Sequence, residues 1–509
     1  MNMFYAFSCG LDGLNTKFVR VEVNIKRGIP RFQIVGLAAA STKEATDRVR
    51  IAIENSGYEF PMQSVLVNLA PADSKKNETW FDLPIATLIL IISEQMKTCI
   101  DFEKFLFIGE LGLDGSVKAM KGLINILLEA KKEEFDSVVI PYPNRFEASI
   151  IKDLNIYTIS HLNELEDILM LRKPKDDFNF EIETNQKIPE KINLFNDQIQ
   201  AMRGLSIAIA GRHHTLMIGN PGAGKTMLAR LASTLQPPLN EEEYIGLLKI
   251  QSSREHILST NALKVYRPFR SPHHTSSDIS IVGGGRDVKM GEITLAHNGI
   301  LFLDELGEFK SQVIQTLREP MEEGIITIAR ANNHLTYPAS FLLIAATNPC
   351  PCGYFGSEIK PCICTELRIN RYLSKFSGPF LDRIDIRLEL TTFRNEYRKT
   401  SEVNLAEIQS QIFRAVEIQK LRYKDFKMKY NGFLEGQYID KLFLISEKSR
   451  YIWEKLQTEN QFSIRKVLKI KKLARTIADL AESEYIQEEH IFESLGYQKE
   501  KVQNLRMVA

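Results

Sequence analysis

The chain has 509 residues, of which 44% are hydrophobic and 25% are charged, and this composition is typical of globular domains. A prior of roughly 100–200 residues per domain predicts about three domains. The formal net charge of +1 excludes a strongly basic protein, so a binding site for a polyanion must be a local patch.

The start of the chain lacks the basic segment and apolar core of a signal peptide. The longest apolar run, residues 83–92, lies between acidic residues and is too short to cross a bilayer. Six cysteines in such a chain argue against structural disulfides. We therefore expect a cytoplasmic protein with no membrane partner.

Residues 1–170 show the mixed pattern of an α+β domain. Alternating apolar residues predict a strand over 18–23, and helical spacing predicts a helix over 41–56. The dipeptide Asp114-Gly115 lies between two short apolar segments and predicts a hairpin.

Three further regions follow along the chain. Residues 171–190 carry mixed charge and little hydrophobic periodicity, which predicts a linker. Residues 191–392 alternate predicted strands with predicted helices, as in a parallel sheet. Residues 393–509 have a mostly helical pattern, so we expect an α/β protein that ends in a helical domain.

A phosphate-binding loop begins the second of these regions. A short apolar run at 216–218 leads into G-x-x-x-x-G-K-T, and a helical segment follows, which is the context that a P-loop requires. Its backbone N–H groups would surround phosphate oxygens, Lys225 would reach the β- and γ-phosphates, and Thr226 would hold Mg²⁺. The pattern predicts binding of ATP and Mg²⁺ by Gly219, Asn220, Pro221, Gly222, Ala223, Gly224, Lys225 and Thr226.

Two carboxylates end a later apolar strand over residues 299–303. Asp304 would ligate Mg²⁺, directly or through water, and Glu305 would polarise the attacking water. A buried strand capped by solvated acids is the alternative. The P-loop upstream favours the catalytic interpretation, because phosphoryl transfer needs both tasks at one strand end.

Four cysteines form the pattern C-x-C-x₉-C-x-C: Cys350, Cys352, Cys362 and Cys364. Clustered thiols in a reducing compartment suggest a tetrahedral Zn²⁺ site. The spacing within each pair is tighter than the usual C-x₂-C, so four unligated thiols are the alternative. The consecutive histidines His273 and His274 are assigned no metal, and a structural or nucleotide-relay role is favoured for them.

The order of these motifs resembles that of AAA+ ATPases. Asn348 ends the apolar strand over 341–347 and fits the water-orienting position called sensor 1. The helices after residue 393 look like the AAA+ lid, with Arg465 at the position called sensor 2. A turn asparagine and a surface arginine are the respective alternatives.

The segment G-P-F-L-D-R at 378–383 matches the place where AAA+ proteins carry an arginine finger. There Arg383 would stabilise charge on the γ-phosphate held by a neighbouring subunit, which implies a ring. An ion pair of Arg383 with Asp382 or Asp385 is the alternative.

Nearly the whole chain resembles the ComM/YifB family of magnesium-chelatase-like AAA+ ATPases. The motifs that carry the resemblance include R-S-P-H-H-T at 270–275, G-E-I-T-L-A-H-N-G at 291–299, N-P-C-P-C-G at 348–353 and A-R-T-I-A-D-L at 474–480. The resemblance implies a homo-hexamer that drives DNA branch migration, as a helicase, during recombination of incoming DNA in natural transformation. A magnesium-chelatase-type subunit and a protein-remodelling ATPase are the competing functions.

The N-terminal domain resembles its counterpart in the same family through V-N-L-A-P-A-D at 67–73 and G-E-L-G-L-D-G at 109–115. The family domain is similar in fold to the Lon peptidase domain, which uses a Ser–Lys dyad. Trp80 and Ile124 stand at the dyad positions, and neither side chain can act as nucleophile or base. We therefore expect a Lon-like fold without peptidase activity.

Given the family, two segments are candidates for contact with single-stranded or branched DNA. Residues 278–290 place three glycines beside Arg286 and Lys289, and residues 325–338 form a predicted hairpin that includes Arg330. Such basic groups suit phosphate contacts. Solvated surface loops are the alternative for both segments.

Overall fold

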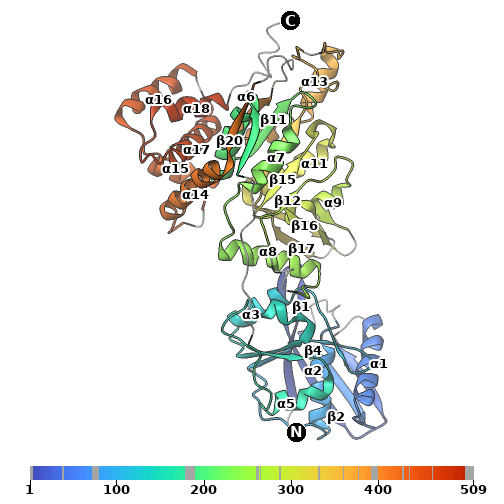
Figure 1. Ribbon diagram of the computed structural model, residues 1–509. Coiled ribbons are helices and arrows are strands. Elements are labelled where there is room, and N and C mark those ends of the chain that lie inside the picture. The colour runs from blue at the N-terminus through green and yellow to red at the C-terminus, as the bar shows by residue number, and fades with distance from the viewer. Residues whose placement is uncertain are drawn as a thin grey trace. The chain divides into compact units, whose positions relative to one another are not determined.

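The computed structural model describes residues 4–36, 39–71, 79–177, 190–259, 263, 265–285, 288–330, 333–358, 360–376, 378–390, 399–426, 429–434, 436–460 and 462–498. It divides into two compact units (Figure 1). The first unit comprises Met1–Thr184 and Asn240–Val265, and the second comprises Asn185–Leu239 and Tyr266–Ala509. Each unit thus draws on two separate stretches of the chain.

A mixed seven-stranded sheet forms the first unit, in the order β3-β4-β2-β1-β5-β8-β9. The pairs β1–β2 and β2–β4 are antiparallel and the others are parallel. The strands are β1 (Phe4–Asp12), β2 (Asn15–Lys26), β3 (Arg31–Val35), β4 (Ser64–Ala70), β5 (Phe105–Phe107), β8 (Ser137–Pro141) and β9 (Asn155–Ile159). These strands occur together with helices, which confirms the predicted α+β pattern, and the strand predicted at 18–23 lies within β2.

Alternate strand residues point to opposite faces of this sheet. Both faces carry buried apolar side chains, and helices cover both. Phe107 of β5 belongs to a core that includes α1 (Ala39–Asn55) and α2 (Asp82–Ile92), whereas its neighbour Leu106 packs with α3 (Leu123–Lys132). The hairpin predicted at Asp114-Gly115 joins β6 (Glu110–Leu111) to β7 (Val117–Lys118). Shorter helices complete the unit: α4 (Arg145–Ala148) and α5 (Leu165–Leu169).

The helix α8 (Glu241–Arg254) belongs to this first unit although it follows the P-loop in the sequence. It starts with a capping box, in which Glu243 N donates to Asn240 Oδ1 at 2.9 Å and Asn240 N donates to Glu243 Oε2 at 3.1 Å. The amide of Asn125 in α3 donates to Lys249 O at 3.1 Å and to Ser253 Oγ at 2.8 Å. These contacts hold α8 against α3.

A parallel five-stranded sheet forms the core of the second unit, in the order β12-β15-β18-β11-β19. All of its strand pairs are parallel. The strands are β11 (Thr215–Gly219), β12 (Phe269–Arg270), β15 (Ile300–Leu303), β18 (Leu342–Thr347) and β19 (Ile386–Leu390). The short, nearly continuous apolar runs of β15 and β18 are fully buried, as expected for strands covered on both faces.

Helices pack against this sheet, and a helical C-terminal region lies to one side of it (Figure 1). Near the sheet lie α6 (Asn196–Gly211) and α7 (Lys225–Thr234), while β10 (Lys191–Phe195) pairs antiparallel with β20 (Thr400–Asn404). The C-terminal helices are α14 (Leu405–Arg422), α15 (Gly436–Leu442), α16 (Glu447–Asn460), α17 (Ile464–Leu480) and α18 (Glu488–Gly496). The predicted parallel-sheet core with a helical C-terminal region is confirmed. None of the described helices combines the length and the apolar character needed to cross a membrane.

Candidate nucleotide site and cysteine cluster

The P-loop lies between β11 and α7 and requires glycine at two positions. A Cβ at Gly219 would lie 2.6 Å from Leu390 O, and one at Gly224 would lie 2.6 Å from Gln198 Nε2. Gly224 also has φ of +90° and directly precedes α7. At Gly222, where φ is +78°, an added Cβ would meet no atom within 4 Å. The loop therefore leaves open space beside the positive end of a helix, which fits a phosphate group.

Lys225 is buried at the base of this loop. Its Nζ donates to Gly219 O at 2.6 Å and to Asn348 Oδ1 at 3.0 Å. Burial lowers the pKa of Lys225, and the nearby carboxylates of Asp304 and Glu305 oppose this shift. The ammonium thus joins the P-loop to the end of β18, where sensor 1 is expected.

The acids after β15 face the P-loop from the neighbouring part of the sheet. Thr226 Oγ1 donates to Asp304 Oδ2 at 2.6 Å, and Asp304 Oδ1 accepts from Glu305 N at 2.9 Å. A hydroxyl and a carboxylate oxygen at this distance are the hard donors that Mg²⁺ takes beside phosphates. The residues present therefore fit the expected Mg²⁺–ATP complex.

Glu305 contacts His274, and the sequence pattern did not predict this contact. Its backbone is left-handed, with φ of +51°, and its Oε2 lies 3.1 Å from His274 Nδ1. The ring of His273 lies 4.2 Å from that of His274, between ring centroids. The His-His motif was the available signal, but only the fold brings His274 to the carboxylate.

The two arginines expected to sense or complete the nucleotide site contact other groups. Arg383 Nη2 lies 2.7 Å from Glu322 Oε1 and its Nη1 donates to Pro379 O at 2.6 Å. Arg465, at the start of α17, lies 3.2 Å from Asp382 Oδ2. Among the contacts described, Arg383 therefore pairs with Glu322, and not with Asp382 or Asp385 as the alternative interpretation expected. Its role as a finger stays a prediction.

The two candidate DNA segments pack against each other within the second unit. One contains β13 (Gly283–Gly284) and β14 (Lys289–Met290), and the other is the hairpin of β16 (Ile325–Arg330) and β17 (Asn333–Pro338). A Cβ at Gly283 would lie 2.7 Å from Ile328 Cδ1. Lys289 is exposed. Arg286 lies outside the described residues, and so does the side chain of Arg330.

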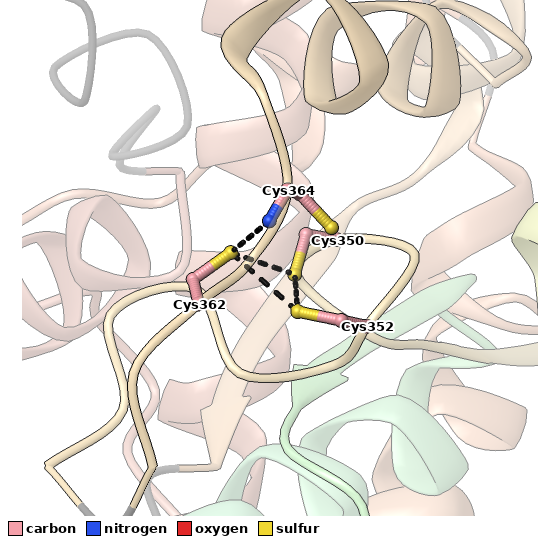
Figure 2. Close-up of side chains that lie close together, drawn as sticks. All are labelled: Cys350, Cys352, Cys362 and Cys364. Atoms are coloured by element: carbon pink, nitrogen blue, oxygen red, sulfur yellow. Dashed lines mark hydrogen bonds between the residues drawn. The ribbon is translucent and has the colours of Figure 1, made fainter.

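The four predicted metal-binding cysteines meet in the loop that follows β18 (Figure 2). Their Sγ atoms all lie within 4.8 Å of one another. Cys350 is buried, and the others are partly exposed. The structure therefore brings together the thiols of two C-x-C pairs, nine residues apart, into a group that could hold one metal ion.

Three family models match consecutive parts of the chain. The model "Subunit ChlI of Mg-chelatase" matches residues 21–144, and "Magnesium chelatase, subunit ChlI" matches 192–398. The model "Magnesium chelatase, subunit ChlI C-terminal" matches 402–498. The matched regions include the P-loop, the acids after β15 and the cysteine cluster.

Relatives match over almost the full length. The "Competence protein ComM" of Haemophilus influenzae is 36% identical over 98% of this chain and 97% of its own. The protein YifB of Escherichia coli is 37% identical over 95% of each chain. The "Probable DNA helicase MCM9" of Arabidopsis thaliana is 25% identical over 39% of this chain and 25% of its own. The family models and the site support an ATPase, and the full-length identities show that the chain belongs to the ComM/YifB family of magnesium-chelatase-like AAA+ proteins.

Proposed function

We propose that this protein is an ATP-hydrolysing ring motor that acts on DNA, as a helicase promoting branch migration. The observation that carries the hydrolysis step is the meeting of three chain segments at one edge of the parallel sheet. Lys225 contacts Asn348, and Thr226 contacts Asp304. Ligands of open parallel sheets bind at the carboxyl ends of the strands, where these residues lie.

Each group has a task that follows from its chemistry. The loop N–H groups and Lys225 bind the phosphates, while Thr226 and Asp304 would hold Mg²⁺, which would supply positive charge to offset that of the phosphates. Glu305 accepts a hydrogen bond from the attacking water and orients it, and His274 holds the carboxylate in place. Asn348 completes the site from β18. Zn²⁺ is proposed separately, for the cysteine cluster.

We also propose a homo-hexameric ring, in which Arg383 acts on the nucleotide of the neighbouring subunit. Arg383 is 15% exposed, and in its own chain it is paired with the exposed Glu322. Because this acid of α12 (Arg318–Glu323) is exposed, the guanidinium can exchange it for a γ-phosphate of the next subunit. The finger and the sensor role of Arg465 both belong to this ring proposal.

The DNA-directed part is supported by the paired hairpins and by the names of two relatives. Lys289 is exposed on β14, and its hairpin packs on Ile328 of the second hairpin. A ring needs basic groups only where it surrounds its track, so the net charge of +1 is compatible with such a motor. The names of the ComM and MCM9 relatives, which refer to competence and DNA helicase, agree with DNA as the substrate.

The test is the rate of ATP hydrolysis with and without single-stranded or forked DNA. We expect DNA to raise the rate and the affinity for DNA to fall steeply with salt, because contacts to phosphates release counterions. Lys289→Ala should lower the DNA-stimulated rate more than the basal rate. The matched control is Lys97→Ala, an exposed lysine of the first unit. Stimulation by unfolded protein but not by any DNA would favour a protein-remodelling ATPase instead.

A further inference from the structure

The cysteine loop contacts the P-loop directly. Asn220, the second residue of the P-loop, donates from Nδ2 to Gly353 O at 2.6 Å. Gly353 has φ of +84°, and a Cβ there would lie 2.7 Å from Cγ and Cδ of Pro221. The backbone between Cys352 and the next turn therefore lies against the first half of the phosphate cradle, and only glycine permits this approach.

The same loop begins at the sensor 1 position. Asn348 accepts from Lys225 Nζ at 3.0 Å, and Cys350 follows two residues later. Cys350 has no exposed surface. The loop thus holds the P-loop at two points, through Asn348 on Lys225 and through Gly353 on Asn220, and the cysteines lie between and beyond them.

The separations among three of the four sulfur atoms match a metal site, and Cys364 Sγ lies within 4.8 Å of each of them. The Sγ separations are 3.4 Å for Cys350–Cys352, 3.5 Å for Cys352–Cys362 and 3.6 Å for Cys350–Cys362 (Figure 2). A tetrahedral ion with Zn–S bonds of about 2.3 Å separates its sulfurs by about 3.8 Å, whereas a disulfide requires about 2.05 Å. The separations fit a shared ion and exclude a disulfide in this conformation.

Backbone donors also face these sulfurs. Phe355 N donates to Cys350 Sγ at 3.3 Å, and Cys364 N donates to Cys362 Sγ at 3.4 Å. Backbone N–H groups commonly donate to the sulfurs of metal-binding cysteines, and these hydrogen bonds orient the side chains as ligands. A soft tetrathiolate set selects Zn²⁺ over the hard Mg²⁺ of the nucleotide site.

We propose that the four thiolates bind one Zn²⁺ ion and that this ion fixes the loop supporting Asn220 and Asn348, so that zinc occupancy controls nucleotide affinity. Binding releases the thiol protons and joins the two cysteine pairs across the intervening loop. Without the cross-link the loop gains conformational freedom, and ordering it again costs free energy each time nucleotide binds. The zinc site stands alone, whereas its effect on nucleotide rests on the proposed ATPase function.

The metal site is tested by elemental analysis of the full-length protein, purified under reducing conditions without chelator. We expect about one zinc per subunit, from one set of four thiolates. Cys352→Ser and Cys364→Ser should lose the ion, and Cys99→Ser, a cysteine of the first unit outside the cluster, should keep it. Cobalt substituted for zinc should show the visible absorption of a tetrahedral thiolate complex. Protein that contains no zinc and takes up no cobalt would overturn the proposal.

The coupling is tested by equilibrium binding of a fluorescent ATP analogue. Wild-type protein stripped of metal should bind it about tenfold more weakly than reloaded protein, within the usual range of coupling between sites. This comparison does not depend on the folding of a cysteine variant. Asn220→Ala should keep its zinc, yet its nucleotide affinity should respond less to metal removal.

Two outcomes are separable in this experiment. Equal nucleotide affinity of stripped and reloaded wild-type protein would overturn the coupling even if zinc is present. Failure of the zinc-loaded protein to bind nucleotide at all would contradict the proposed ATPase function, while the metal analysis would still decide the zinc site.

Discussion

Glu305 and its neighbour Asp304 direct their carboxylates to different partners. The left-handed backbone of Glu305, with φ of +51°, costs about 1 kcal/mol for a residue with a Cβ. Asp304 contacts Thr226, whereas Glu305 contacts His274. In the proposed function the strained turn therefore separates the carboxylate that would bind Mg²⁺ from the one that would orient water, and strain of this kind is common at catalytic positions.

Replacing Glu305 by glutamine is expected to block hydrolysis while leaving nucleotide binding intact. The phosphate cradle and Lys225 are unchanged, but the amide cannot orient and polarise water as a carboxylate does. We expect hydrolysis to slow by at least ~10²-fold at a similar nucleotide affinity. Rates and affinities would be measured together, with Glu308→Gln, an exposed acid three residues on, as control. Normal turnover of Glu305→Gln would remove this residue from the mechanism.

The nucleotide site shows which residues a sequence can predict. Lys225, Thr226 and Asp304 could be predicted because each belongs to a local motif whose strand context is visible in the pattern. The contact of Glu305 with His274 and that of Asn220 with Gly353 join segments far apart in the chain. Sequence spacing carries no information on such distances, so these partners required the fold.

The helix α8 also shows that local sequence does not predict contacts between distant segments. Its start is encoded locally by the capping box of Asn240 and Glu243. Its packing partner is α3, which lies more than a hundred residues earlier in the chain. An amphipathic pattern predicts that one face is buried but not against which element. A helix inside the stretch 191–392, expected to form the ATPase core, thus joins the compact unit of the N-terminal residues.

The packing of α8 within the first unit includes a buried acid, Glu147. Ser252 Oγ donates to Glu147 Oε2 at 2.6 Å, and Asn144 Nδ2 donates to Glu147 Oε1 at 3.0 Å. Burial raises the pKa of Glu147 to about 7, although both hydrogen bonds lower it. The protonated form is therefore favoured by folding, and its stabilising contribution is complete below the ordinary pKa of about 4.5 and is lost as pH rises through about 7.

The expected result is a stability that depends on pH at this one position. At about 1.4 kcal/mol per pKa unit, ionising Glu147 in the folded protein costs up to roughly 3 kcal/mol. Glu147→Gln, which cannot ionise, should therefore have a higher Tm than wild type at pH 8 and little advantage at pH 5. Glu133→Gln, an exposed acid near the end of α3, is the control. A Tm difference that stays the same at both pH values would contradict a raised pKa.

The proposed ring divides each catalytic site between two copies of the chain. Lys225, Thr226 and Glu305 would come from one subunit, and Arg383 would come from the next. The contact of Arg383 with Glu322 in its own chain gives the guanidinium a resting partner. An acid that holds a finger in this way would be exchanged for phosphate charge only in the assembled ring.

Mixing two inactive variants tests this division directly. Arg383→Ala should lower hydrolysis by about 10³-fold, as loss of an arginine finger does, and Lys225→Ala should fail to bind nucleotide productively. In mixed rings some interfaces combine an intact Lys225 from one variant with an intact Arg383 from the other, so part of the activity should return. Lys225→Ala mixed with Glu305→Gln is the matched control, because both defects lie in the same half of the site and no interface becomes complete. Activity that returns in neither mixture, although mixed rings form, would mean that Arg383 acts within its own subunit or only stabilises the fold.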